Sequence, residues 1–305
     1  METEKINIGC RAKEDFANFL ETAEIKDIFP SRVKGKFLLI KYTNDASRET
    51  DFLRYVFENL PLYSLSKEER DSLEPNTILR LWKTAVDRFV SNSKTGEFGE
   101  IILFHLLELF EGAVQIVNKM ALKTSGEMHA HGADAIHFGL DGSLKTLYLG
   151  ESKTYQSFGD ALNKALSDIN NYHKNGGRQF DIKLVSGNLP EDIPEETRKM
   201  IKDYLNPCKS DLFDFTEAHA VFIGYQYDSL QSIEQNHRGV ELINKALELY
   251  RESIKQYLAD IESKFKEFPD LANKNFLFFI IPFKDLKGSR EKFAKAVENG
   301  KKVDI

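Results

Sequence analysis

The stretch that decides the fold is Thr146-Leu147-Tyr148-Leu149-Gly150-Glu151-Ser152-Lys153. Its first residues form a short apolar run that predicts a buried strand, and the run ends in a carboxylate and an ammonium two residues apart. Alternate residues of a strand point to the same face, so Glu151 and Lys153 are expected to share one. Burying charge is costly without a partner, and this strand end is therefore a candidate site.

A second apolar segment lies just upstream, Ala133-Asp134-Ala135-Ile136-His137-Phe138, with an acid near its start. The pair Asp141-Gly142 is a turn signal between the two apolar runs, and it predicts a β-hairpin. The interval between Asp134 and Glu151 is long enough for two strands and their connection. The sequence therefore predicts that Asp134, Glu151 and Lys153 converge on one edge of a sheet.

The composition is that of a globular protein that does not bind nucleic acid through its overall charge. The chain has 305 residues, of which 41% are hydrophobic, enough for one large domain or two ordinary ones. Its net charge is −6. Contact with DNA or RNA would require a local basic patch or a partner protein.

The cysteines and the hydrophobic runs indicate a cytoplasmic protein. The chain has 2 cysteines, Cys10 and Cys208, which form neither a disulfide framework nor a zinc set and suit a reducing compartment. The N-terminal residues lack the apolar region of a signal peptide, and the most hydrophobic run, Phe276 to Phe283, is too short to span a bilayer. No membrane role is expected.

We expect two units, an N-terminal mixed α/β extension over residues 1–94 and a larger unit over residues 95–305. The polar cluster at residues 91–96 marks the boundary, with Thr95 available as a helix N-cap. Apolar spacing within the extension predicts a strand over residues 36–42 and helices through residues 52–60 and 78–89.

The pattern of the second unit predicts an α/β fold with a mixed central sheet flanked by helices. A helix from about Glu97 through Phe110 is apolar nearly all round and should be buried. Besides the two apolar runs above, strands are expected at residues 114–117, 181–185, 219–225 and 276–281, and helices at residues 158–172 and 243–265.

A third acid, Glu100, lies in the second turn of the buried helix between apolar neighbours such as Ile101 and Leu103. A carboxylate in such surroundings needs a partner, and a metal at the strand edge would provide one. Glu97 has a simpler explanation, since an acid in the first turn complements the helix dipole. We therefore rank Glu100 above Glu97 as a metal ligand.

These residue types suit hydrolysis of a phosphodiester by metal-activated water. Carboxylates hold hard cations such as Mg²⁺, and a nearby positive group orients the water or stabilises the developing charge. Taken alone, Glu151 and Lys153 would fit an ordinary surface ion pair, which contributes about 0–1 kcal/mol. Their occurrence together with Asp134, each at the end of an apolar strand, favours a functional site.

The order of these features resembles the PD-(D/E)xK nuclease core, whose elements follow one another as αβββαβ. Ala133 stands here in place of the proline of that motif. A more specific likeness covers Gly96 to Glu100, His131 to Phe138 and Leu149 to Lys153. This set resembles HamA, the nuclease subunit of the bacterial Hachiman anti-phage system.

The resemblance implies a role for each candidate residue. Asp134 and Glu151, joined by Glu100, would be ligands of Mg²⁺, with Mn²⁺ as a possible substitute, and Lys153 would be the catalytic lysine. The substrate would be DNA, and the partner a superfamily-2 helicase of the HamB type, which can hold the DNA that an acidic chain holds poorly. A different class of function stays open, a non-catalytic subunit that regulates the helicase and keeps the nuclease core as a scaffold.

Other chemistries are less favoured by the sequence. His129 and His131, with His137 or Asp134 as a third ligand, could hold zinc, but their segment is typical of a loop. A Gly-x-Ser-x-Gly elbow and a Walker phosphate loop are both absent. Basic residues that could contact DNA phosphates around the site, or simply form solvated helix faces, are Lys145, Lys164, Lys174 and Arg178.

Overall fold

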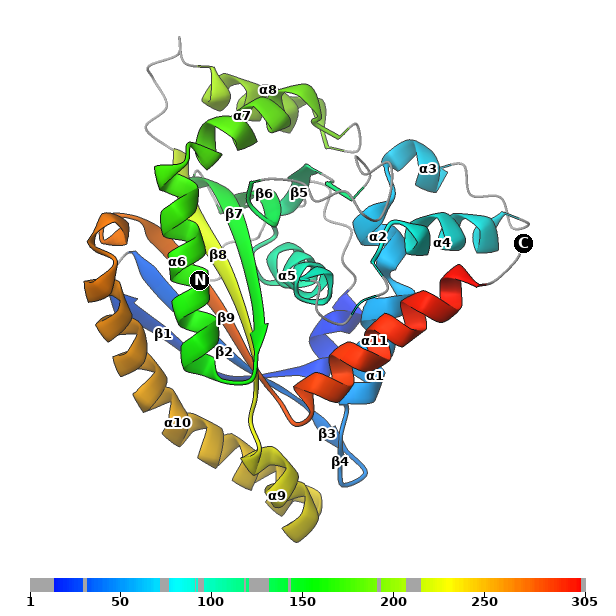
Figure 1. The fold of residues 1–305 in the computed structure, drawn as a ribbon, viewed down its shortest axis with the longest axis vertical. Helices are drawn as coiled ribbons and strands as arrows, with labels where there is room; N and C mark the ends of the chain where they lie inside the picture. Colours follow the sequence, from blue (N-terminus) through cyan, green and yellow to red (C-terminus); the bar gives the residue numbers. More distant parts are fainter. Residues whose placement is uncertain are drawn as a thin grey trace.

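A seven-stranded mixed sheet forms the centre of the molecule, with its strands in the order β1-β2-β9-β8-β7-β6-β5 (Figure 1). The computed structural model describes residues 14–302 apart from 30–31, 72–76, 91, 93–95, 118, 121–131, 142–143, 191–192 and 207–214. The strands of this sheet are β1 (Leu20–Phe29), β2 (Val33–Ile40), β5 (Val114–Val117), β6 (Ala135–Asp141), β7 (Leu144–Tyr155), β8 (Phe215–Gln226) and β9 (Asn275–Phe283). A small second sheet pairs β3 (Tyr42–Thr43) with β4 (Ala46–Ser47).

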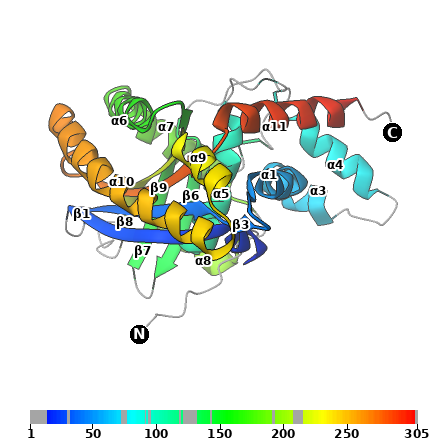
Figure 2. The same ribbon diagram turned by 90° about the horizontal axis from the view of Figure 1, so that it is seen from below.

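Helices pack around this sheet. They are α1 (Glu49–Glu58), α2 (Leu60–Ser64), α3 (Lys67–Asp71), α4 (Ile78–Asp87), α5 (Glu97–Phe110), α6 (Phe158–Lys174), α7 (Gly177–Gly187), α8 (Glu195–Leu205), α9 (Ser229–Asn236), α10 (Gly239–Glu267) and α11 (Leu286–Lys301), with 3-10 turns η1 (Glu14–Phe19) and η2 (Pro269–Leu271). In Figure 2, α1, α4 and α11 gather on the right of the molecule and α6 and α10 on the left. Among the described residues, no helix has the length and apolar character needed to cross a lipid bilayer.

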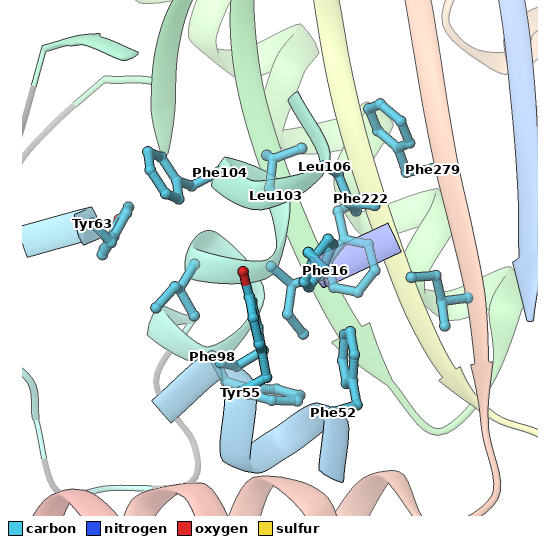
Figure 3. Packing of buried hydrophobic residues seen from close by; sticks show 14 of the residues in the cluster. Phe16, Phe52, Tyr55, Tyr63, Phe98, Leu103, Phe104, Leu106, Phe222 and Phe279 are labelled. Carbon is cyan, nitrogen blue, oxygen red and sulfur yellow. The ribbon is translucent and has the colours of Figure 1, made fainter. Parts of the chain in front are cut away.

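Both faces of the sheet are covered, as the side chains of β9 illustrate. Phe279 and Ile281 join a core cluster with α1, α5 and α11, whereas Phe278 and Ile280 join a second cluster with α6 and α10. Figure 3 shows the first cluster, in which α5 lies between the strands and the N-terminal helices. A strand that is parallel to its neighbours and buried on both faces is expected to be a continuous hydrophobic run, as β9 is.

The part of the sheet that carries the candidate site follows the order α5-β5-β6-β7-α6-β8, with α7 and α8 inserted between α6 and β8. β5, β6 and β7 are antiparallel neighbours, and β8 is parallel to β7. The predicted hairpin is present, with Asp141 opposite Leu144 and Ala135 opposite Gly150. The mixed α/β sheet with flanking helices and the αβββαβ order are therefore confirmed.

The residues before position 95 contribute to the same sheet. β2 is parallel to β9, and β1 is antiparallel to β2 at the edge. Phe52 of α1 and Phe98 of α5 share one core cluster with Phe293 of α11. The N-terminal extension is thus continuous with the rest of the fold in both its sheet and its core.

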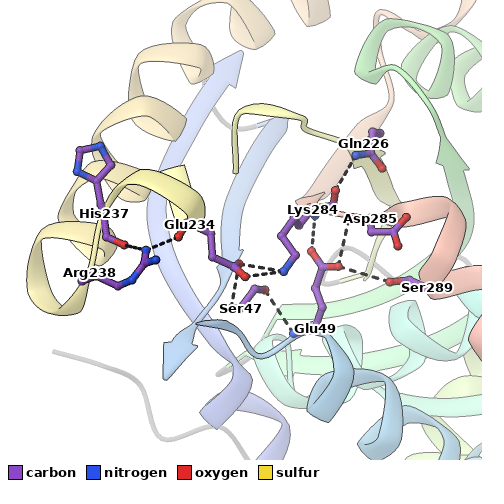
Figure 4. A network of polar contacts seen from close by, with 9 residues as sticks. All are labelled: Ser47, Glu49, Gln226, Glu234, His237, Arg238, Lys284, Asp285 and Ser289. Carbon is purple, nitrogen blue, oxygen red and sulfur yellow. Dashed lines mark hydrogen bonds and ion pairs between the residues drawn. The ribbon is translucent and has the colours of Figure 1, made fainter. Parts of the chain in front are cut away.

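A buried carboxylate links α1 to the junction of β9 and α11 (Figure 4). The Glu49 side chain accepts hydrogen bonds from the backbone N–H groups of Lys284 and Asp285, the second at 3.2 Å. Lys284 in turn pairs with Glu234 at 2.8 Å. Burial raises the pKa of Glu49, and the two backbone donors oppose that shift. One side chain thus holds together segments from opposite ends of the chain.

One predicted element is wrong, because residues 181–185 belong to helix α7 and not to a strand. The sequence Asp-Ile-Lys-Leu-Val alternates as a strand would, but Asp181 and Val185 lie four residues apart and are both buried. Val185 packs in a third cluster with the strands β5 to β7 and helix α8. Tertiary contacts therefore decide this segment. Thr95, Cys10, Cys208, His129 and His131 lie outside the described residues.

Candidate active site

The β6-β7 hairpin brings Asp134 and Glu151 to the same end of the sheet. Asp134 lies immediately before β6, and its backbone N–H donates to the carbonyl of Gly150 at 2.9 Å. One oxygen of its carboxylate, Oδ2, accepts hydrogen bonds from the backbone N–H of Ser152 at 2.9 Å and from its hydroxyl at 3.2 Å. The residue between Glu151 and Lys153 thus orients Asp134.

Gly150 is required where the two strands meet the buried helix. A Cβ at this position would lie 2.7 Å from the Cβ of Ala135 and 2.9 Å from Cδ2 of Leu103 on α5. Real Cβ atoms do not approach other atoms so closely, so this position excludes any side chain unless the neighbours move. The close approach keeps Glu151 next to the start of β6.

Lys153 lies between two carboxylates. Its ammonium forms a short ion pair with Glu151 and a second ion pair with Oδ2 of Asp168 on α6 at 3.1 Å. The other oxygen of Asp168 pairs with Lys164, one helical turn earlier, at 2.6 Å. Asp168 was missed at the sequence level because an Asp four residues after a Lys is typical of an exposed helix pair.

Carboxylates outnumber the ammonium groups around Lys153 at this strand end. Burial raises the pKa of Glu151 to about 8, the charge of Asp134 adds to this effect, and Lys153 opposes it. Burial disfavours the charged form of Lys153, but the carboxylates of Glu151 and Asp134 outweigh it and raise the pKa of the ammonium above its usual range. One ammonium is therefore shared among closely spaced carboxylates.

A cavity of about 590 Å³ opens over these side chains. Asp134, Glu151 and Lys153 line one side, so the structure brings together these sequence-predicted residues. α6 and the start of α7 also contribute to the lining, with Asp168, Asn175 and Gly177 among their residues. The wall is polar, as expected for a site that binds a charged group.

Glu100 and Glu97 are held by different partners. The carboxylate of Glu100 accepts a hydrogen bond from the buried hydroxyl of Tyr63 on α2 at 3.1 Å. Glu97 is almost fully buried, and its carboxylate accepts from the backbone N–H of Val90 at 2.7 Å, which ties it to the end of α4. Burial raises the pKa of Tyr63, and the charges of Glu100 and Asp134 raise it further.

The donor set suits a hard cation. Asp134 and Glu151 present carboxylate oxygens to one cavity, and a divalent ion such as Mg²⁺ would stabilise the ionised form of Glu151 that burial and Asp134 disfavour. Across the described part of the chain, no group of three or more His, Cys, Asp or Glu side chains is arranged to hold a metal ion. Glu100 is not among the residues that line the cavity of Asp134 and Glu151, and its carboxylate is bound to Tyr63.

Two buried residues that the sequence did not single out, Lys119 and Asp181, bind the residue that precedes Asp134. Lys119, which follows β5, donates a short hydrogen bond to the carbonyl of Ala133. Its ammonium is 3.8 Å from Oδ1 of Asp181 on α7. Burial lowers the pKa of Lys119, and the carboxylates of Asp181, Asp134, Glu100 and Glu151 oppose that shift. No local sequence signal marks Lys119, and Asp181 fell in the segment predicted as a strand.

The zinc alternative gains little from the described residues. His137 is fully buried on β6, and its ring centroid lies 5.9 Å from that of Phe104. It is not among the residues that line the cavity of Asp134 and Glu151. The other two histidines of that hypothesis lie outside the described residues.

Each basic residue considered for DNA contact has a partner within the protein. Arg178 pairs with Glu217 through its Nε at 2.9 Å, and Lys174 lies 3.6 Å from Asp270. Lys164 pairs with Asp168, and the ammonium of Lys145 lies 5.0 Å from the centre of the Phe215 ring. These side chains therefore do not form a free basic patch.

Comparison with known proteins assigns the family. A search of curated proteins found no match. The HamA family model matches residues 14–297, which is nearly the whole chain and includes every residue of the site described above. The chain therefore belongs to the HamA family, a component of the Hachiman defence system.

Proposed function

We propose that this protein is a metal-dependent deoxyribonuclease that hydrolyses phosphodiester bonds as the effector of a Hachiman anti-phage complex. The observation that carries the proposal is the convergence of Asp134, Glu151 and Lys153 on one polar cavity at the end of β7. Carboxylates beside a lysine in one polar cavity suit Mg²⁺-assisted attack on a phosphate. Membership of the HamA family supports the same reading.

Each side chain has a distinct task in this proposal. Asp134 and Glu151 would hold Mg²⁺, with Glu100 as the additional carboxylate, and Mn²⁺ would substitute. The bound ion would polarise the phosphate and lower the pKa of a water molecule. Lys153 would orient that water or neutralise charge on the attacked phosphate. Asp168, 3.1 Å from the ammonium, holds Lys153 on the cavity side of the strand.

A helicase partner would provide most of the affinity for DNA. The chain carries a net charge of −6, and the basic residues near the cavity are paired within the protein. Affinity for DNA comes largely from contacts of basic side chains with phosphates. A superfamily-2 helicase of the HamB type would hold the DNA and deliver it to the cavity.

The first prediction is that replacing Glu151 and Lys153 together with alanine abolishes DNA cleavage and leaves the fold intact. A loss of at least about 10³-fold is expected, because both the metal site and the positive group are removed. The measurement is cleavage of plasmid DNA by the purified protein, with and without its helicase, in Mg²⁺ or in EDTA.

The matched control is the double alanine variant of Lys264 and Glu267, an exposed ion pair of 2.9 Å on α10. This variant should cleave as the wild type does. Mg²⁺-dependent cleavage by the Glu151/Lys153 variant at the wild-type rate would contradict the site assignment. Helicase binding without cleavage by the wild type under any activating condition would instead support the non-catalytic scaffold.

A further inference from the structure

Ala133, the residue that precedes Asp134, is held by two buried charged groups, one at its carbonyl and one at its N–H. The carbonyl of Ala133 accepts a hydrogen bond from the ammonium of Lys119, and its N–H donates to Oδ2 of Asp181 at 3.1 Å. Lys119 comes from the segment after β5 and Asp181 from α7. Two segments distant in sequence therefore bind the same residue.

The chain passes so close to Asp181 that only glycine fits before Ala133. Gly132 has a φ of +95°, which side-chain-bearing residues rarely adopt. A Cβ there would lie 2.2 Å from Oδ1 of Asp181 and 3.2 Å from Nζ of Lys119. The conformation of the loop is therefore adapted to the two charged groups.

Asp181 is itself fixed by a third element. The hydroxyl of Tyr172 on α6 donates to Oδ2 of Asp181 at 2.9 Å, and Tyr172 also lines the cavity of Asp134 and Glu151. Asp181 is 2% exposed and Lys119 is 7% exposed. Burying an ion pair rarely stabilises a fold more than apolar side chains of the same volume would. Stability alone is thus a poor reason for these two charges.

A better reason is that both residues bind Ala133, which directly precedes Asp134. On its other side Asp134 is bound to β7 through the carbonyl of Gly150 and through Ser152. With Ala133 bound by Lys119 and Asp181 as well, the backbone at Asp134 is held both to β7 and to the segments that carry these two residues. A ligand that is already in place loses little conformational freedom when the ion binds, and affinity rises accordingly.

We propose that Lys119 and Asp181 are positioning residues that clamp the backbone of Ala133 and so hold the Asp134 carboxylate next to Glu151 for metal binding. The proposal rests on the proposed function, since it assigns these residues to the same metal site. It also gives α7 a task, because this helix supplies one half of the clamp.

The experiment compares the full-length wild type with a Lys119→Met/Asp181→Leu double variant. The double variant removes both charges together, so that neither is left buried without its partner. Lys183→Met, on the exposed face of α7, is the matched control, and Asp181→Asn is the conservative variant that can still accept from Ala133 and Tyr172. Thermal unfolding of each variant establishes that it is folded.

Three quantities are measured: backbone hydrogen exchange over residues 132–138, the Kd for Mn²⁺ by calorimetry, and the Mg²⁺ concentration that gives half-maximal DNA cleavage. The double variant should exchange faster and bind Mn²⁺ about 10–100-fold more weakly, the usual effect of removing groups that orient a metal ligand. Its cleavage rate at saturating Mg²⁺ should recover to within about threefold of the wild type, since Lys153 and both ligands remain. Asp181→Asn should lie between the two, and Lys183→Met should match the wild type.

The outcomes separate the clamp from the proposed function. Unchanged exchange and unchanged Mn²⁺ affinity in the folded double variant would overturn the clamp, whether or not the wild type cuts DNA. Weakened Mn²⁺ binding without DNA cleavage by the wild type would support the clamp and overturn the nuclease. A wild type that binds no Mn²⁺ would overturn both.

Discussion

At the scale of single residues, the site depends on close approaches that leave no room for substitution. Gly150 lies between Ala135 of β6 and Leu103 of α5, and it directly precedes Glu151. A methyl group at this position can be accommodated only if β7 moves away from α5. The position of the Glu151 carboxylate is therefore coupled to the packing of the buried helix.

We expect Gly150→Ala to lower the free energy of unfolding by about 1–3 kcal/mol, the usual cost of overpacking a core. Because β7 shifts, the Kd for Mn²⁺ should rise as well. Gly159→Ala is the control, since a Cβ at this position in α6 meets no atom within 4 Å and should be neutral or slightly stabilising. Urea unfolding of the two variants measures the difference. Equal stability of Gly150→Ala and the wild type would show that β7 adapts without strain.

At the scale of elements, α6 connects the sheet to the site. It carries Asp168 against Lys153, Tyr172 against Asp181 and His173 against His219 of β8. The two imidazoles are joined through their Nε2 atoms at 2.8 Å. Burial lowers the pKa of His219 to about 3, with the charge of His173 adding to the effect, and burial also lowers the pKa of His173.

This pair predicts that the fold loses stability in mild acid. Above about pH 6.5 both imidazoles are neutral in the folded and unfolded chain, so they add no pH dependence. Below that pH the unfolded chain binds protons that the folded chain does not, and the free energy of unfolding falls until about pH 3. His219 alone should account for about 1–2 kcal/mol between pH 7 and pH 5. In His219→Gln the fall in the free energy of unfolding between pH 7 and pH 5 should be smaller by this amount. Urea unfolding at several pH values measures it. The same pH dependence in the variant and the wild type would contradict the role of His219.

At the scale of the whole molecule, the two ends of the chain complete one structure. β2 lies against β9, and Glu49 of α1 accepts hydrogen bonds from the backbone of Lys284 and Asp285. Removing this carboxylate leaves two partly buried N–H groups without their acceptor. We expect Glu49→Ala to cost about 1–3 kcal/mol in the free energy of unfolding.

The control is Glu58→Ala at the exposed end of the same helix, which should change stability by less than about 0.5 kcal/mol. Both variants are measured by urea unfolding, with the transition followed by far-UV circular dichroism and by Trp82 fluorescence. A single coincident transition is expected, because the N-terminal segment shares the sheet and the core. A separate early transition reported by Trp82 would show instead that the extension unfolds as an independent unit.

Local pattern was sufficient for the elements that carry the main site residues. The apolar run of β7, the turn signal after β6 and the acids at the strand ends predicted that Asp134, Glu151 and Lys153 meet, and they line one cavity. A hairpin brings the ends of its two strands together without contacts from the rest of the chain. Periodicity also predicted the buried helix α5 and the long helix α10, since each buries a continuous apolar surface.

What the sequence by itself determined is thus the central hairpin, the buried helix before it and the convergence of Asp134, Glu151 and Lys153 at the end of the hairpin. Only the tertiary structure decided that residues 181–185 are helical, that Lys119 and Asp181 both bind Ala133, and that β2 pairs with β9. The physical reason is the range of the interactions. Hydrophobic periodicity and turn chemistry act between residues near in sequence, whereas a buried charge or an added strand depends on neighbours that only the folded chain brings together.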